Sequence, residues 1–246
     1  MSFEPKNRNA DYGIDAPGVI RNLILVGVMG ALIFSLAPSI LHFGPVGISR
    51  FAFALTAVIC LVEAALMLLY SKWGKFKHRD KMLDAIPWRG DERVLDVGTG
   101  RGLLLVGAAK RLTTGTAVGI DIWSKKDLSS NTAEAARRNL EIEGVLPKSA
   151  LVSEGAQKMS FVDSSFDIVV SNLCIHNIAS RAERDQACKE IARVLKPGGH
   201  AIISDFKNTG NYAESFKKSG LSVKRSGFSL FTFPPLRIVT AIKRQT

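Results

Sequence analysis

A glycine-rich turn preceded by an acidic residue is the part of the sequence best suited to bind a small molecule. The stretch 94–102 has the sequence VLDVGTGRG, and an apolar helical pattern follows it. Glycines permit positive φ angles and allow the backbone to approach a ligand closely. The N-terminal turn of the following helix presents free N–H groups. The pattern therefore predicts a ligand-binding loop between a strand and a helix.

Two acidic residues restrict which ligand this loop can hold. A dinucleotide-binding loop has the spacing GxGxxG around a pyrophosphate, whereas this loop has GxGxG and carries Asp96 two positions before Gly98. A carboxylate at that point repels a pyrophosphate and attracts a cation. Asp121 ends the next apolar run and can accept hydrogen bonds from ribose hydroxyls. Together these features predict an adenosyl ligand that lacks phosphate.

The elements that position this loop form a regular alternation. Short apolar runs are interleaved with helical patterns along the second part of the chain. Strand and helix in alternation predict a parallel α/β sheet that is covered on both faces. The expected strands are 93–97, 117–121, 150–153, 166–171 and 200–205, and the expected helices are 102–112, 131–143 and 181–195.

Two long apolar segments precede the α/β region. Residues 23–41 carry no charge, and residues 51–70 carry one, Glu63. About 20 apolar residues in a helix span the hydrocarbon core of a bilayer. The short link at 42–50 contains glycine and proline, so the two segments predict an antiparallel transmembrane hairpin. We expect Pro38 to kink the first helix near its end.

The distribution of charge predicts the orientation of this hairpin. The chain has 33 basic and 22 acidic side chains, a formal net charge of +11. Residues 71–90 contribute +4 and residues 207–246 contribute +7, whereas 1–70 and 91–206 are each neutral. The positive-inside rule then places both termini and the α/β domain in the cytoplasm, facing an anionic leaflet. Nucleic acid is disfavoured as a partner, because the basic residues flank a membrane segment.

The apolar segments also admit other interpretations. They could form a buried helical cap on a soluble enzyme, whereas a cleaved signal peptide fits poorly because a second span follows directly. Glu63 lies about 10 Å inside the cytoplasmic end of its helix, where it either contacts a substrate head group or packs between helices. The expected organisation is an N-terminal segment and possible lid (1–22), the hairpin (23–70), a basic juxtamembrane helix (71–90) and a catalytic domain (91–246).

Four motifs in order resemble class I S-adenosylmethionine-dependent methyltransferases, and within them the ubiquinone/menaquinone-methyltransferase-like group (methyltransferase type 11). They are VLDVGTGRG at 94–102, GID at 119–121, FVDSSFDIV at 161–169 and EIARVLKPGG at 190–199. The resemblance covers about residues 76–246. It implies a Rossmann-like fold with a mostly parallel seven-stranded sheet whose last strand is antiparallel.

The resemblance implies S-adenosylmethionine as cofactor, with S-adenosylhomocysteine as product. Asp96 and the backbone of Gly98 and Gly100 would hold the methionine end, Asp121 the ribose and Ile122 the adenine face. The three cysteines lack CxxC spacing, which argues against a zinc site, and no metal is expected. The full set implied for the cofactor is Asp96, Gly98, Thr99, Gly100, Gly102, Asp121, Ile122, Gly155, Ala156, Asn172 and Leu173.

One departure from the family pattern affects adenine recognition. Gly155 stands where the family usually carries an adenine-binding aspartate, next to Ala156 on the adenine edge. Glu154 and Gln157 are the candidates to replace it. Asn172 and Leu173 are expected beside the transferring methyl group.

Methyl transfer from a sulfonium is an in-line displacement, so the enzyme chiefly positions the two partners. A general base is needed only for a poorly acidic nucleophile. Each candidate also has a structural alternative, such as a loop histidine, a buried apolar cysteine or a linker. The catalytic candidates are His176, Asn172 and Asp205, and the substrate candidates are Tyr12, Asp15, Glu63, Cys174 and His176.

The sequence predicts a membrane-anchored methyltransferase with an apolar or lipid-phase acceptor such as a quinone or a lipid. Aromatic residues within 228–233, close to basic side chains, suit a membrane-facing edge or the core. A second hypothesis keeps the chemistry but assigns a small soluble nucleophile, namely a thiol, halide or amine. A third, of another class, is a membrane-tethered nicotinamide oxidoreductase or a cofactor-binding protein without turnover.

Overall fold

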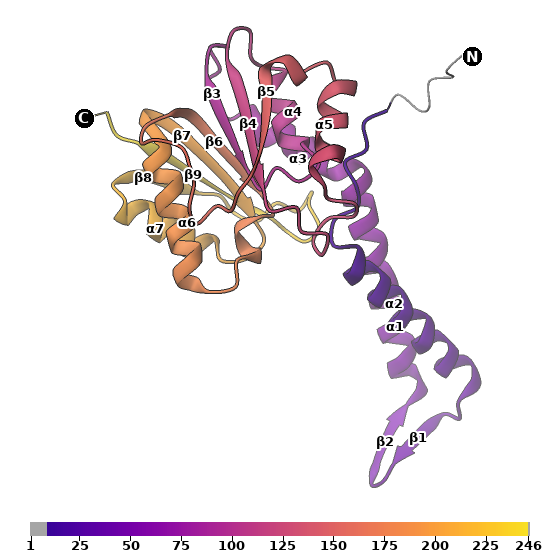
Figure 1. Cartoon of the computed structure of the whole chain (residues 1–246). Coiled ribbons are helices and arrows are strands. Elements are labelled where there is room, and N and C mark those ends of the chain that lie inside the picture. Colours follow the sequence, from indigo (N-terminus) through magenta and orange to yellow (C-terminus); the bar gives the residue numbers. More distant parts are fainter. Residues whose placement is uncertain (1–8, 246) are drawn as a thin grey trace, which may run out of the picture.

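In the computed structural model, the chain forms an α/β domain from which a helical hairpin projects (Figure 1). The structure describes residues 9–245. The first eight residues of the predicted N-terminal segment 1–22 therefore lie outside the described part.

The domain is built on one seven-stranded sheet with the order β5-β4-β3-β6-β7-β9-β8. The strands from β3 to β7 pair in parallel, and β9 pairs antiparallel with both β7 and β8. This arrangement confirms the expected mostly parallel sheet with an antiparallel last strand. The bounds are β3 Arg93–Val97, β4 Thr116–Asp121, β5 Ser149–Ser153, β6 Phe166–Asn172, β7 Leu195–Asp205, β8 Leu221–Arg225 and β9 Arg237–Lys243.

Helices cover both faces of the sheet, and each face has its own buried apolar core. One face is covered by α3, α4 and α5, and the other by α6 and α7 (Figure 1). The bounds are α3 Lys75–Leu83, α4 Leu103–Ala109, α5 Ala133–Ile142, α6 Arg181–Val194 and α7 Thr209–Lys218, with short 3₁₀ turns at Leu146–Lys148 and Ile175–Asn177.

The projecting hairpin consists of α1 (Pro17–Leu36) and α2 (Arg50–Leu69), joined at its tip by strands β1 (Ile40–Phe43) and β2 (Val46–Ser49). The predicted helix at 23–41 therefore begins earlier and ends sooner than expected. The prediction that Pro38 kinks this helix was wrong, because the helix has already ended. A residue before proline favours extended backbone, and Ala37 adopts φ −86° and ψ 157°.

Small residues allow the two helices of the hairpin to pack closely. A Cβ atom added to Gly30 would lie 2.8 Å from the carbonyl oxygen of Phe53, and one added to Gly27 would lie 2.7 Å from Leu61 Cγ. Ala57 and Ala64 of α2 are buried in the same hairpin. Close contact through glycine and alanine is typical of helix pairs in membranes.

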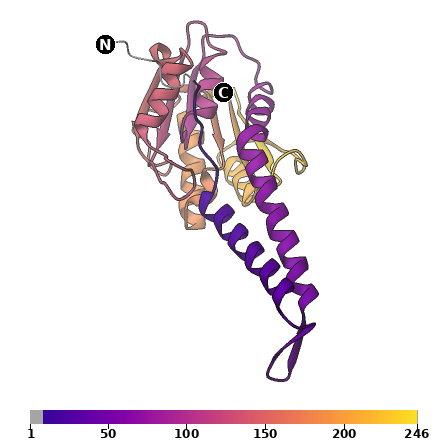
Figure 2. The same ribbon diagram turned by 90° about the vertical axis from the view of Figure 1, so that its right-hand side faces the viewer.

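The second helix of the hairpin runs into the domain without a break. Residues Arg50–Leu83 form one helix of 34 residues, in which a π-helical turn at Tyr70–Gly74 separates α2 from α3. Residues 9–16 lie against this helix and the domain, where Lys75 Nζ donates to the carbonyl oxygens of Tyr12 and Gly13 at 2.8 and 2.6 Å. Figure 2 shows this strap leading into α1, beside the long helix.

Candidate active site

The glycine loop follows β3 at the carboxyl edge of the sheet. The N–H groups of Gly98 and Thr99 donate to the carbonyl oxygen of Ile120, at 2.8 and 3.0 Å, which fixes the loop against β4. Gly98 has φ +72°, and a Cβ atom there would lie 2.2 Å from Cys174 Sγ. Only glycine fits this position, because any side chain would be strained and would collide with Cys174.

Asp96 is a buried carboxylate inside this loop, with 1% of its surface exposed. Its Oδ2 accepts a hydrogen bond from Thr99 Oγ1 at 2.7 Å, whereas its Oδ1 is buried and has no hydrogen-bond partner among residues 9–245. Burial raises the pKa of Asp96 to about 7, because desolvation disfavours the charged form. An unpaired buried carboxylate oxygen suits the ammonium group of a ligand.

Asp121 is held in place by backbone and side-chain donors at the end of β4. Its Oδ2 accepts from the Gly100 N–H at 2.8 Å, and its Oδ1 accepts from the Trp123 N–H at 2.6 Å and from Asn131 Nδ2 at 3.2 Å. Trp123 adopts φ +59°, uncommon for a non-glycine residue. Asn131 Oδ1 is buried without a partner. The sequence contained no signal for either residue: Trp123 reaches Asp121 through its backbone N–H in a tight turn, which any residue type offers, and Asn131 reaches it across a loop of ten residues.

The predicted adenine side has an exposed apolar surface and an unpaired acceptor. Ile122 is 72% exposed, although it is a large apolar residue beside the loop. Gly155 and Ala156 follow β5, and a Cβ atom on Gly155 would lie 3.7 Å from Ile122 Cγ2. Glu154 Oε2 accepts from the Ser160 N–H at 3.1 Å, whereas its Oε1 is buried without a partner.

A kinked backbone follows β6 on the other side of the glycine loop. Leu173 adopts φ +54° and donates its N–H to the carbonyl oxygen of Ser204 at 3.0 Å. Such a conformation costs about 1–3 kcal/mol and often occurs at functional sites. The preceding Asn172 has its Oδ1 buried without a partner. The chain that follows this kink brings Cys174 next to Gly98.

His176 and Asp205 form a close pair at the ends of β6 and β7. His176 Nδ1 lies 2.8 Å from Oδ1 of the fully buried Asp205, and the His176 N–H donates to Asp205 Oδ2 at 3.2 Å. Tyr212 donates its hydroxyl to the same Oδ2 at 3.2 Å. This arrangement orients the imidazole and leaves Nε2 as the nitrogen that can face a substrate.

The three substrate candidates from the N-terminal part lie in different places. The Tyr12 hydroxyl donates to Glu143 Oε1 at 2.9 Å, and its ring packs on Phe76 with centroids 5.6 Å apart. This placement gives Tyr12 a packing role in the core instead of a lid role. Asp15 of the strap accepts from Ser71 Oγ of the π-helical turn at 3.0 Å, and it pairs with Leu128, which contacts the glycine loop. Glu63 is half-buried in the hairpin helix α2.

Two further polar side chains that sequence reasoning missed lie near this edge. Tyr70 is in the π-helical turn, and His78 is in α3, where its Nε2 lies 2.7 Å from Ser204 Oγ. The Tyr70 hydroxyl and His78 Nδ1 are both buried without a partner. The sequence predicted Tyr70 only as the last residue of the apolar run 51–70.

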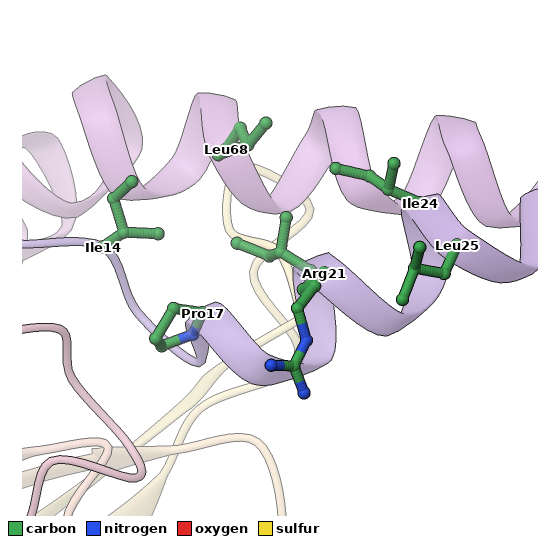
Figure 3. Close-up of a pocket in the computed structure, with 7 residues that line it drawn as sticks. Ile14, Pro17, Arg21, Ile24, Leu25 and Leu68 are labelled. Atoms are coloured by element: carbon green, nitrogen blue, oxygen red, sulfur yellow. The ribbon is translucent and has the colours of Figure 1, made fainter. Parts of the chain in front are cut away.

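An apolar groove lies between the domain-proximal ends of α1 and α2 (Figure 3). It has a volume of about 270 Å³. No residue of the glycine loop lines it, so it is separate from the cofactor position. The lining residues are Ile14, Pro17, Ile20, Arg21, Ile24, Leu25 and Leu68.

Comparison with known proteins agrees with this geometry. Residues 95–203 match the family model described as a methyltransferase domain. The chain is 36% identical over 115 residues to the ubiquinone/menaquinone biosynthesis C-methyltransferase UbiE of Laribacter hongkongensis. These aligned residues make up 46% of this chain and 43% of that protein. The chain thus spans less than half the length of this curated relative.

Solved structures share the fold at low sequence identity. An S-adenosylmethionine-dependent methyltransferase of Methanosarcina mazei superimposes with a TM-score of 0.54 at 19% identity, over 64% of this chain and 95% of that one. An O-methyltransferase family protein of Burkholderia thailandensis gives a TM-score of 0.58 at 16% identity, over 93% of this chain and 72% of that one. The fold and the site together define a class I methyltransferase domain. These matches support an S-adenosylmethionine-dependent methyltransferase domain in this chain, and S-adenosylmethionine is the cofactor of that class.

Proposed function

We propose that this protein is a membrane-anchored methyltransferase that transfers a methyl group from S-adenosylmethionine to an apolar or lipid-phase acceptor, such as a quinone or a lipid. The observation that carries the proposal is the continuity of one helix from an apolar hairpin into the site. The same helix, Arg50–Leu83, has exposed apolar side chains in the hairpin and packs on the sheet within the domain.

The residues of the cofactor half fit S-adenosylmethionine, which when bound supplies an electrophilic methyl group on sulfur. Asp96 Oδ1 is the unpaired acceptor for its ammonium group. The Asp121 carboxylate would accept from the ribose hydroxyls, and the exposed Ile122 side chain would pack on the adenine. S-adenosylmethionine has no phosphate group, so the loop needs no phosphate-binding contact. This agrees with the carboxylate of Asp96 in the loop, which would repel a phosphate.

The residues of the acceptor half position the nucleophile and take up its proton. Cys174 lies beside Gly98, and Asn172 comes two residues before it at the end of β6, so an acceptor atom placed there would face the methyl donor. Where the acceptor is an O–H or N–H group, its proton passes to His176 Nε2, and Asp205 stabilises the resulting imidazolium. An acceptor that is already ionised needs no such base.

Exposure and packing support insertion of the hairpin in a bilayer. Only 17% and 11% of the apolar windows of the two helices are buried within the protein, whereas a core helix of a soluble protein is mostly buried. Contact between the helices uses glycine and alanine, as membrane helix pairs do. With the basic residues of 71–90 next to the span, both termini and the domain belong on the cytoplasmic side, at an anionic leaflet.

The proposal is tested by tritiated methyl transfer from S-adenosylmethionine to fractionated lipid and aqueous extracts. We expect label in the organic phase. Label confined to thiols, halides or amines of the aqueous phase would instead support the soluble-acceptor hypothesis. Tight binding of NADH without binding of S-adenosylhomocysteine would contradict the methyltransferase assignment.

Membrane insertion has its own test. Carbonate at high pH should leave the full-length chain in the membrane pellet, because two spans are held by the hydrocarbon core. Release into the supernatant would show that the hairpin is a peripheral or soluble element.

A further inference from the structure

The groove between α1 and α2 is closed at its domain end by the N-terminal strap. Leu68 of α2 and the first turns of α1 form its sides, and Ile14 of the strap lies at the end next to the domain (Figure 3). The Ile14 N–H donates to Ser129 Oγ at 2.8 Å, and the Ser129 N–H donates to the carbonyl oxygen of Ile14 at 3.1 Å. A ligand in this groove therefore contacts both the hairpin and a segment that the domain holds in place.

The size and lining of the groove suit part of a hydrocarbon chain. Apart from Arg21, every side chain that lines it is apolar. Its volume of about 270 Å³ is slightly below the range of about 300–1,000 Å³ that is typical of small-molecule sites. The groove is therefore too small for a whole lipid but large enough for a segment of one chain. Leu25 in its lining is 60% exposed, so the groove opens toward the surroundings of the hairpin.

Arg21 places a positive charge at the edge of this groove. It is the one charged residue of α1, and the first turn of that helix has no acidic residue to offset the positive end of the helix dipole. Among residues 9–245 its guanidinium donates only to Asn22 Oδ1, from Nε and Nη2 at 3.4 Å each, and pairs with no carboxylate. Figure 3 shows the guanidinium turned away from α2. A free cation beside an apolar groove matches an anionic head group attached to a hydrocarbon chain.

The position of Arg21 along the hairpin also favours a phosphate. Arg21 lines the same groove as Leu68, and Lys72 follows Leu68 by about one helical turn. Arg21 is thus at the end of the hairpin where the basic segment 71–90 begins. In a bilayer this end would lie among the head groups of one leaflet. A guanidinium binds two phosphate oxygens at once, which an ammonium group does less well.

We propose that the groove binds one anionic phospholipid, with the lipid phosphate on Arg21 and part of one acyl chain between α1 and α2. The inference rests on the membrane insertion that is part of the proposed function, and it does not depend on the methyl acceptor. The bound lipid would fill the space between the hairpin and the strap and hold the two together. It would differ from the lipids around any membrane helix, because one residue would select it by charge.

The test titrates the full-length protein in detergent micelles with dioleoylphosphatidylglycerol or dioleoylphosphatidylcholine, and native mass spectrometry counts the bound lipids. We expect the first phosphatidylglycerol to bind at least about tenfold more tightly than phosphatidylcholine, as for a hydrogen bond to a charged group. Arg21→Gln should abolish this preference. Lys72→Gln is the matched control, because Lys72 is an exposed cation at the same end of the hairpin but does not line the groove. It should bind both lipids as the wild type does.

A second pair of variants tests the groove separately from the charge. Leu25→Trp fills the groove and should weaken the binding of both lipids by about tenfold or more, since each excluded methylene group lowers the affinity by about fourfold. Val26→Trp is its control, because Val26 is the next residue of α1 and is also exposed but does not line the groove. This variant should bind both lipids normally.

Four results would overturn the proposal. They are equal affinities of the wild type for the two lipids, equal losses in Arg21→Gln and Lys72→Gln, equal losses in the two tryptophan variants, and displacement of phosphatidylglycerol by an equal concentration of inorganic phosphate. The last result would mean that the anion binds without the chain. Release of the protein from membranes by carbonate would instead contradict the membrane anchoring in the proposed function itself.

Discussion

Asp96 illustrates how the fold prepares a single side chain for a charged ligand. The carboxyl group is almost fully enclosed, and only one of its oxygens has a partner. Enclosure disfavours the ionised form, which is the form that a ligand ammonium needs. The ionised carboxyl group therefore lowers the stability of the free protein and raises its affinity for the ligand.

We expect the affinity for S-adenosylhomocysteine to rise with pH through about 7, the pKa of Asp96 in the free protein. At still higher pH it should fall again, once the α-amino group of the ligand loses its proton. Isothermal titration from pH 5.5 to 9 measures this profile. Asp96→Asn should weaken binding and remove the rise near pH 7. A rise that persists in this variant would assign the titration to another group.

The stability of the free protein should depend on pH in the opposite sense. The pKa of Asp96 in the folded state is higher than its value of 3.8 in the unfolded chain. Its contribution to the free energy of unfolding is therefore fully present below about pH 4 and is lost as the pH rises through about 7. Denaturant unfolding of wild type and Asp96→Asn over this range, without cofactor, should show a decline that only the wild type has.

Glu154 is the residue that we expect to replace the missing adenine-binding aspartate. Its Oε1 is buried without a partner and can accept from the adenine amino group. Glu154→Ala should weaken S-adenosylhomocysteine binding by about tenfold, the value of one hydrogen bond to a charged group. S-inosylhomocysteine, which lacks that amino group, should bind wild type and variant alike. An equal loss for both ligands would show that Glu154 only supports the loop.

At the scale of elements, the sequence predicted the sheet well, because its strands have distinct boundaries. The run at 93–97 lies between a charged turn and the glycine loop, and β3 has those bounds. β7 was predicted from 200 but begins at Leu195. The proline and glycines at 197–199 suggested a turn, whereas the structure accommodates them as an irregularity in the pairing of β7 with β6.

From residues alone, the site was easiest to predict where neighbouring residues in sequence make it. Asp96 and the glycines belong to one loop, so their spacing was sufficient. Tyr70 and Asn131 contribute through contacts with distant segments, for which no local pattern exists. The Tyr12 hydroxyl likewise goes to Glu143, 131 positions away, and only the folded chain shows this.

The close packing of α1 on α2 leads to a prediction about the hairpin. Gly30→Leu should destabilise it by about 1–3 kcal/mol, since the side chain would overlap the Phe53 backbone. Gly18→Leu, on the same helix, is the control, because nothing lies within 4 Å of its Cβ position. Thermal unfolding in detergent micelles compares the two. Equal stability of both variants would mean that the helices separate in the folded protein.

The segment between β8 and β9 is a second element suited to lipid. Leu230 and Phe231 are 87% and 93% exposed, and the segment (yellow) lies beside the domain-proximal end of the long helix in Figures 1 and 2. Basic side chains such as Lys224 and Arg225 lie next to it in the sequence. Exposed apolar groups with basic neighbours are typical of a surface that dips into a leaflet.

Phe231→Asp should therefore raise KM for a vesicle-borne acceptor by about tenfold or more, since withdrawing such a side chain from an apolar phase costs about 1.5–3 kcal/mol. Binding of S-adenosylhomocysteine should not change. Val162→Asp is the control, because Val162 is also exposed but precedes the amino end of β6. A similar KM in both variants would exclude membrane contact by this segment.

At the scale of the whole molecule, charge and apolar surface are divided between different parts. The hairpin is apolar, and the net positive charge lies in residues 71–90 and 207–246. The cofactor-binding region between them is neutral. This division suits a catalytic domain that rests on an anionic leaflet, and excess salt should weaken only the part of membrane contact that depends on these basic residues.

If the hairpin is inserted as proposed, the unbroken helix from Arg50 to Leu83 would make the active site responsive to the dimensions of the bilayer. A span that is longer than the local hydrocarbon thickness tilts, and no flexible linker separates this span from Tyr70 or His78. Tilt would therefore shift the acceptor side of the pocket relative to the cofactor side. Turnover in vesicles of increasing acyl-chain length should pass through an optimum, and a flat profile would mean that the π-helical turn acts as a hinge. With such an optimum, the rate of methylation would report the thickness of the membrane.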